Sequence, residues 1–286
     1  MAELHLTESL RIKSSHGKFS DLSPLLMRLS TISKNNLEKS QKMIHIYESC
    51  LLHMKVYVAC NNETISMLYL NLGTLFESGN NTEKALICYE KASELRVKGG
   101  SNIRIEALVR MATLLMCCEC DVEAKDTLDM VCKETECKDT AQVLMLQGQL
   151  LERSNKVHEA IECYEKALLV ESNHDQEIVI RCKADLSNLL LGLQLHENAK
   201  KHVDDVINRS EGIVKVKLFL LRGQILQTEQ KENEALKYFD GAISLLLALN
   251  KKKSSSNSFQ EKSYRLLLAK AKYLKGSVQG KCFFYY

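Results

Sequence analysis

The side chains best suited to chemistry in this sequence are its cysteines, which number 11 among 286 residues. Five of them gather in one stretch, at Cys117, Cys118, Cys120, Cys132 and Cys137. Paired cysteines at short spacing are typical of a structural zinc site, in which four ligands each lie within about 2.3 Å of the metal. Whether these thiols can meet depends on the elements that carry them.

The elements predicted around this cluster hold its thiols too far apart for one metal ion. Cys120 falls in a predicted turn and Cys132 lies 12 positions further along a predicted helix. A rise of about 1.5 Å per residue then separates them by roughly 18 Å. We therefore expect structural thiols, with no metal site and no cofactor. Cys88 and Cys163, on apolar helix faces, are expected to be small buried hydrophobic residues.

Motifs typical of enzymes are missing from the rest of the sequence. The glycines form neither a G-x-G-x-x-G turn nor a phosphate-binding lysine loop, and there is no H-E-x-x-H sequence. The eight histidines are scattered, and the carboxylates are not paired by any pattern. The sequence therefore predicts a protein that is not an enzyme.

A set of four residues recurs three times at an interval of 75 positions, and these sets indicate where the helices lie. Each set has a glycine, then a small residue 12 positions later, an aromatic residue 16 later and an alanine 19 later. The sets are Gly73, Ala85, Tyr89 and Ala92; Gly148, Ala160, Tyr164 and Ala167; and Gly223, Ala235, Phe239 and Ala242. Offsets of 12, 16 and 19 share one helix face. Further apolar residues around each glycine indicate a preceding helix, so each set predicts a helix hairpin.

This pattern resembles the tetratricopeptide repeat, whose units extend over about 34 residues. The best match is formed by Tyr69, Leu72, Gly73, Phe76, Ala85, Tyr89 and Ala92. A 75-residue interval is too long for one unit, and degenerate units lie between the clear ones, at Ala112 with Ala124 and at Ser187 with Ala199. The resemblance implies an all-α fold, a right-handed solenoid of stacked antiparallel helix hairpins.

Five units are predicted over residues 66–250, beginning near residues 66, 105, 141, 180 and 216. Residues 1–65 are expected to form a helical cap with a degenerate repeat, 251–258 a Lys/Ser linker, and 259–286 a terminal helix with an aromatic tail. The tail ends in four aromatic residues, which is unusual for the polar cap of a solenoid. It motivates two alternatives: a fragment or variant of a longer array, or a tail that docks on the chain or a partner.

Charge and hydropathy limit the partners and the compartment. The net charge is +3, but residues 251–286 hold nine Lys or Arg against the single acid Glu261, so this segment is +8 and the remainder −5. We interpret the basic segment as a solvated helix and linker and expect no nucleic-acid binding. No segment has the roughly 20 apolar residues of a membrane span, and Met1 to Leu10 lack a signal core. We expect a protein of the cytosol or nucleus.

The resemblance implies that the first helix of each hairpin (below, the first helices) lines a groove for a partner's amphipathic helix or extended peptide. The residues placed at its contact positions are Met67, Leu70, Thr74, Val109, Thr113, Met116, Gln142, Met145, Gln149, Asn188, Leu191, Leu220 and Gln224. Arrays that grip the carboxylate tails of chaperones carry clustered Lys, Arg and Asn, where this chain has residues such as Leu70 and Gln142. We expect no such binding.

Two functions remain. The first is a non-catalytic scaffold or adaptor that holds a partner in this groove, as a subunit of a larger complex. The alternative is a regulatory or targeting part of a larger, possibly catalytic, protein whose other domains are absent from this sequence.

Overall fold

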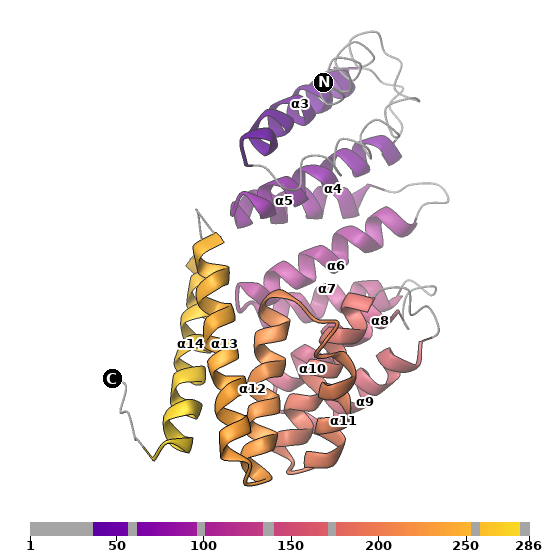
Figure 1. Ribbon diagram of the computed structural model, residues 1–286. Coiled ribbons are helices and arrows are strands. Elements are labelled where there is room, and N and C mark those ends of the chain that lie inside the picture. The colour runs from indigo at the N-terminus through magenta and orange to yellow at the C-terminus, as the bar shows by residue number, and fades with distance from the viewer. Residues whose placement is uncertain are drawn as a thin grey trace. The chain divides into compact units, whose positions relative to one another are not determined.

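The computed structural model describes residues 37–56, 62–95, 101–133, 140–170, 176–252 and 258–280. These residues form twelve α-helices, α3 to α14, and include no strand. The chain divides into two compact units, residues 1–138 and 139–286, and each is described by itself (Figure 1). Most of the predicted N-terminal cap and the four aromatic residues of the tail lie outside the described residues.

The first unit contains two helix hairpins and one preceding helix. Its helices are α3 (Leu37–Val56), α4 (Asn62–Ser78), α5 (Thr82–Glu94), α6 (Ser101–Cys117) and α7 (Asp121–Lys133). Helices α4 and α5 pair, as do α6 and α7, and the second hairpin stacks on the first because α6 packs on both α4 and α5. Helix α3 packs on α4 and adds Met43 and Tyr47 to the core.

The second unit contains three hairpins and a final helix. Its helices are α8 (Ala141–Arg153), α9 (Val157–Leu169), α10 (Gln176–Gly192), α11 (His196–Val206), α12 (Gly212–Thr228), α13 (Glu232–Lys252) and α14 (Ser258–Val278). Pairs α8 with α9, α10 with α11 and α12 with α13 form the hairpins. The first helices of successive hairpins also touch, α8 with α10 and α10 with α12, while α14 packs on α13 and α12.

The turn inside every described hairpin has the same geometry. One residue takes a left-handed backbone conformation, with φ between 58° and 64°, at Asn80, Glu119, Asn155, Gln194 and Gln230. The next backbone N–H donates to a carbonyl of the preceding helix, as in the 2.8 Å bond from Asn81 N to Phe76 O. This pattern satisfies carbonyls that the helix end would otherwise leave without partners. The five turns follow one another at intervals of 39, 36, 39 and 36 residues.

The residues that recur every 75 positions are the contacts between the two helices of a hairpin. Tyr89, Tyr164 and Phe239 are fully buried, and each ring lies against the glycine of its own hairpin. A Cβ atom added to Gly73 would lie 2.4 Å from Cε1 of Tyr89. Only glycine permits this approach, because real Cβ contacts do not fall below 3.0 Å. The predicted fold class, an all-α array of stacked hairpins, is confirmed within each unit.

The linker and the terminal helix differ a little from their predicted bounds. Helix α13 continues to Lys252 and α14 begins at Ser258. Residues 253–257, between the two helices, are outside the described residues. Among the described helices, none combines the length and the apolar character needed to cross a membrane.

Candidate binding surface

A tyrosine and a glutamate link the two helices of one hairpin in each unit. The Tyr89 hydroxyl of α5 donates to Glu77 Oε2 of α4 at 2.6 Å, and 75 residues later Tyr164 of α9 donates to Glu152 Oε2 of α8 at 3.2 Å. Burial raises the pKa of Tyr89, and the Glu77 carboxylate raises it further. The hydroxyl therefore stays protonated and can donate. In the third set both partners change, to Phe239 and Gln227.

Polar side chains also join the first helices of neighbouring hairpins in the second unit. Gln149 of α8 donates from Nε2 to Asp185 Oδ2 of α10 at 2.8 Å, and Lys217 Nζ of α12 lies 3.6 Å from Asp185 Oδ1. Asn188 Nδ2 of α10 donates to Glu152 Oε1 at 3.4 Å. The face shared by α8, α10 and α12 is therefore polar and held in register from helix to helix.

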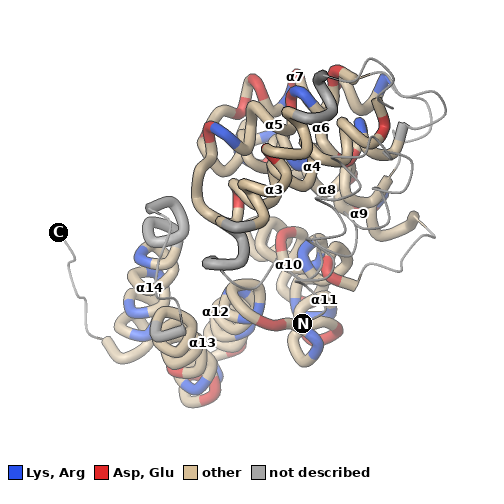
Figure 2. The backbone as a smooth tube through the Cα atoms, turned by 90° about the horizontal axis from the view of Figure 1, so that it is seen from above, with Lys and Arg blue, Asp and Glu red and all other residues tan. Residues whose placement is uncertain are grey.

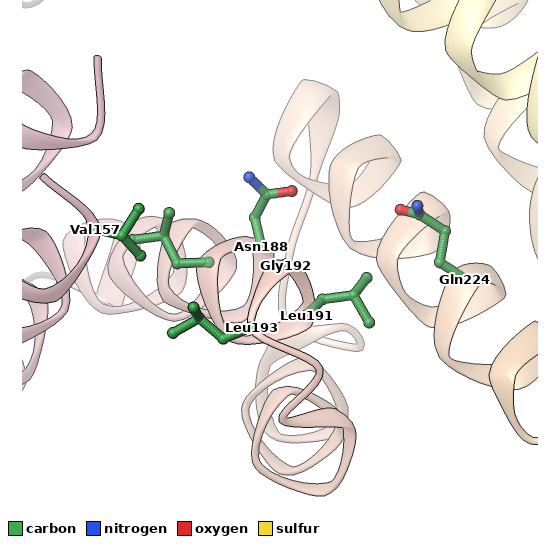
Figure 3. A pocket seen from close by; sticks show the side chains of 7 residues that line it. Val157, Asn188, Leu191, Gly192, Leu193 and Gln224 are labelled. Carbon is green, nitrogen blue, oxygen red and sulfur yellow. The ribbon is translucent and has the colours of Figure 1, made fainter. Parts of the chain in front are cut away.

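A pocket of about 450 Å³ opens beside this face. Its lining residues are Val157, Asn188, Leu189, Leu191, Gly192, Leu193 and Gln224. Figure 3 shows Leu191 and Gln224 projecting from α10 and α12 into the space between these helices, with Val157 and Leu193 on the other side. The pocket thus combines aliphatic side chains with two side-chain amides. We call it the α10–α12 pocket.

One polar atom in this pocket has no partner of its own. Gln224 Oε1 is inaccessible to solvent and accepts no hydrogen bond from any residue that the structure describes. A buried acceptor without a donor costs about 1–3 kcal/mol.

The structure divides the thirteen residues predicted for the groove into two groups. Six have side chains in the hydrophobic core, each at most 8% exposed: Met67, Leu70, Val109, Met116, Met145 and Leu220. Their side chains fill the space between helices, so substitution there changes stability in addition to any binding. The other seven are exposed or half-buried.

Three residues of the accessible group meet in one place. Asn188, Leu191 and Gln224 all line the α10–α12 pocket. Gln149 is engaged with Asp185 and Gln142 is exposed. Thr74 and Thr113 lie in the other unit, and each donates its hydroxyl to a carbonyl of its own helix, at 2.8 Å.

Helical periodicity does not identify Val157 and Leu193, because they lie where a turn meets a helix. A signal for Leu193 is nevertheless present in the sequence. The residues equivalent to it in the other four hairpin turns are Gly79, Cys118, Ser154 and Glu229. Leu193 thus places a large aliphatic side chain, 37% exposed, at a turn where the other repeats carry small or polar residues.

The cysteine cluster provides no metal site within the described part of the chain. No three His, Cys, Asp or Glu side chains are grouped there in a way that could hold an ion. Cys88 and Cys182 are buried, and burial raises the pKa of Cys88 to about 11. Cys163, which was expected to be buried, is only half-buried. Cys137 lies outside the described residues.

These features define an all-α protein built from stacked helix hairpins that are closed by glycine–aromatic contacts. The model of the tetratricopeptide repeat family matches residues 68–96 and 141–174, which contain two of the three glycine–aromatic pairs. These two stretches therefore contain tetratricopeptide repeats, as the resemblance implied. No curated protein matches the sequence.

Solved structures with a similar fold include several repeat proteins. A chain of the APC/C hetero-tetramer Cut9-Hcn1 has a TM-score of 0.63 at 11% identity, with 94% of this chain and 48% of that chain covered. This chain thus spans about half the length of that protein. BtubC from P. vanneervenii gives 0.53 at 16% identity, with 89% and 92% covered. A tetratricopeptide repeat protein from Parabacteroides merdae gives 0.51 at 15%, with 94% and 98% covered. Identities this low establish the fold alone.

Proposed function

We propose that the protein is a non-catalytic scaffold or adaptor that holds a segment of a partner protein at the α10–α12 pocket, as a subunit of a larger complex. Tetratricopeptide repeats support a role in protein interaction, and this fold typically serves as a non-catalytic scaffold. The observation that carries the proposal is the convergence of Asn188, Leu191 and Gln224, from two first helices, on one pocket.

The chemistry of the pocket indicates what the partner segment offers. Leu191, Leu193 and Val157 surround a space that suits one aliphatic or aromatic side chain. The side-chain amides of Asn188 and Gln224, which also line the pocket, can form hydrogen bonds with polar backbone groups of the segment. A short extended peptide or the exposed turn of an amphipathic helix, with one apolar anchor, meets both requirements.

Three further predictions belong to this proposal. We propose that the chain works in the cytosol or nucleus and that its basic C-terminal segment does not bind nucleic acid. We also propose that it does not bind the carboxylate tails of chaperones, because the clamp position of Leu70 holds a buried aliphatic side chain in place of a cation.

The test compares two substitutions two positions apart in the same turn. Leu193→Glu places a charge in the pocket, whereas Leu195→Glu changes a residue that is 46% exposed and outside the pocket lining. Each variant and the wild type are recovered from cells by affinity purification, and stoichiometric partners are quantified by mass spectrometry. We expect Leu193→Glu to lose a partner that wild type and Leu195→Glu both retain.

A second variant separates the amide from the apolar anchor. Gln224→Leu removes the unsatisfied acceptor. It is expected to stabilise the free chain and to weaken binding of the partner. Thermal unfolding of each variant shows whether the fold is intact. Equal recovery of every partner by wild type, Leu193→Glu and Gln224→Leu, with normal unfolding, would exclude the pocket as the binding site.

A further inference from the structure

Helix α14 occupies the place of a first helix in the second unit. It packs on α13 and α12 in the way that α12 packs on α11 and α10. Its sequence also fits the pattern when Lys270 is aligned with the hairpin glycines. Leu266 then stands four positions before and Tyr273 three positions after. The equivalent pairs are Tyr69 with Phe76, Leu144 with Leu151, and Phe219 with Leu226.

In complete hairpins these two positions contact the second helix. The Tyr69 ring of α4 lies 5.7 Å from Lys91 Nζ of α5, and the Phe76 ring lies 5.4 Å from Lys84 Nζ. In the third set, Phe219 of α12 packs edge to face on Tyr238 of α13, with ring centroids 5.5 Å apart. A first helix therefore uses this face to bind its own second helix.

On α14 the same face is uncovered by any described residue. Leu266 is 71% and Tyr273 is 62% exposed, and Ala269 between them is exposed as well. The opposite face is normal core, since Ala271 and Leu274 are buried in the cluster that includes Phe239. Leaving a leucine and a tyrosine in water on one stripe is unfavourable, because removing apolar side chains from water is stabilising, and a matching helix would bury both.

Basic residues border this stripe on both sides. Helical geometry puts Lys270 on one flank and Arg265 and Lys272 on the other, and residues 262–280 contain no Asp or Glu. Lys275 is engaged in a 2.6 Å ion pair with Asp240 of α13. Figure 2 shows that Lys and Arg positions, in blue, recur along α14. The stripe therefore presents an apolar centre between cationic borders.

We propose that the exposed face of α14 is the docking site for an acidic amphipathic helix of a partner protein. The partner helix completes a sixth hairpin and takes the place that α5, α9 and α13 have in theirs. Its apolar face covers Leu266, Ala269 and Tyr273. Because Lys270 replaces the hairpin glycine, the partner carries an Asp or Glu where the other second helices carry Tyr89, Tyr164 or Phe239. This site is separate from the α10–α12 pocket and does not depend on the function proposed for it.

Other occupants fit this face less well. A second copy of α14 would bring Lys and Arg against Lys and Arg, which is unfavourable. Residues 281–286 contain no acid, so they do not complement the basic borders of the stripe. Charge therefore favours an acidic helix.

The test uses two synthetic helical peptides of about 20 residues, long enough to hold helical structure. Both have one leucine stripe, which is flanked by Glu in the first peptide and by Lys in its charge-reversed twin. Fluorescence anisotropy of labelled peptide is measured against the 286-residue chain. We expect saturable binding of the acidic peptide at least about tenfold tighter than that of the basic twin.

Two variants and one control locate the site. Leu266→Glu is expected to lower the affinity for the acidic peptide by at least about tenfold. The control Leu247→Glu, at a residue of α13 that is 48% exposed, is expected to leave this affinity unchanged. Combining Lys270→Glu with Lys272→Glu puts an acid on each flank of the stripe and is expected to weaken binding of the acidic peptide and to strengthen binding of the basic twin. A misfolded variant would bind neither peptide, so this change of preference demonstrates the site without assuming that every variant folds.

Several results would overturn the proposal. Equal binding of both peptides, or binding that Leu266→Glu leaves unchanged, would show that this face is not recognised by charge and shape. Light scattering that reveals a dimer broken by Leu266→Glu would assign the face to a second copy. Peptide binding that needs prior removal of residues 281–286 would assign it to the tail. Adsorption to phosphatidylserine vesicles, with no peptide binding, would assign it to a membrane surface.

Discussion

Replacement of Gly223 by alanine tests the glycine–aromatic contact that closes each hairpin. The added Cβ would lie 2.4, 2.8 and 2.9 Å from Cε1, Cδ1 and Cζ of Phe239. The ring is fully buried and must move to restore an ordinary contact. Overpacking of this kind costs about 1–3 kcal/mol, while alanine in place of glycine within a helix gains up to about 1 kcal/mol. We expect a net loss of up to about 2 kcal/mol in the free energy of unfolding.

Gly192→Ala is the matched control in the same unit. Gly192 is the last residue of α10, and an added Cβ there meets no atom within 4 Å. Only the gain in helix propensity remains, so this variant should equal or exceed the wild type in stability. If the glycines mattered only for backbone conformation, Gly223→Ala and Gly192→Ala would change the free energy of unfolding in the same direction.

The assay is urea unfolding followed by far-ultraviolet circular dichroism, fitted with one transition for each unit. Gly223→Ala should lower the midpoint of the transition that belongs to residues 139–286, and Gly73→Ala the other. Adding Phe239→Leu to Gly223→Ala should reduce the cost of the alanine, because it removes the ring that the Cβ meets. Equal stability of Gly223→Ala and Gly192→Ala would refute the packing argument.

Two further predictions concern the turns and the carboxylates. Gln230→Gly should stabilise the second unit by up to about 1 kcal/mol in urea unfolding, because the left-handed conformation with φ of 62° is strained for a side chain; an unchanged midpoint would contradict this. Burial and Asp185 raise the pKa of Glu152, so its contribution to stability is present at low pH and lost as the pH rises through its folded pKa. Hydrogen bonds from Lys200 and Lys231 lower the pKa of Glu229 to about 2. The contribution of Glu229 to folding stability is therefore present when the pH is above the ordinary pKa of a glutamate, and it is lost as the pH falls through the folded pKa. Relative to the wild type, Glu152→Gln should therefore become more favourable as the pH rises and Glu229→Gln less favourable; parallel pH profiles would contradict the assigned causes.

The sequence was sufficient to predict the hairpins because their contacts use few residue types at fixed offsets. Gly73, Ala85 and Tyr89 are each required by close helix packing, so their spacing records the fold directly. Helix starts were less predictable. Helices α4, α6, α10 and α12 begin at residues 62, 101, 176 and 212, one turn before the predicted start of each repeat. This extra turn adds to the packing, since Ile65, Ile103, Ile178 and Val214 pack against the hydrophobic cores.

The residues that line the α10–α12 pocket were only partly predictable for a different physical reason. Met116 and Met145 lie on the helix face assigned to the groove, but neighbouring helices cover that face and bury both side chains. Burial by a neighbour depends on tertiary packing and leaves no periodic mark in the sequence. Leu193 and Val157 escape the pattern because turns and helix ends have no helical period. Leu191 and Gln224, which helical periodicity assigns to the groove, line the pocket because they lie on helices at the margin of the packed face.

Site-specific photo-crosslinking in cells tests the central claim most directly. A benzoylphenylalanine placed at Leu193, in the pocket, is compared with one at Leu169, which is 79% exposed at the end of α9 and outside the pocket lining. We predict that position 193 gives a discrete crosslinked partner that position 169 does not, and that Gln224→Leu in the same chain reduces its yield. The same crosslinks from both positions, or a yield that Gln224→Leu leaves unchanged, would contradict the assignment of the α10–α12 pocket as the partner site.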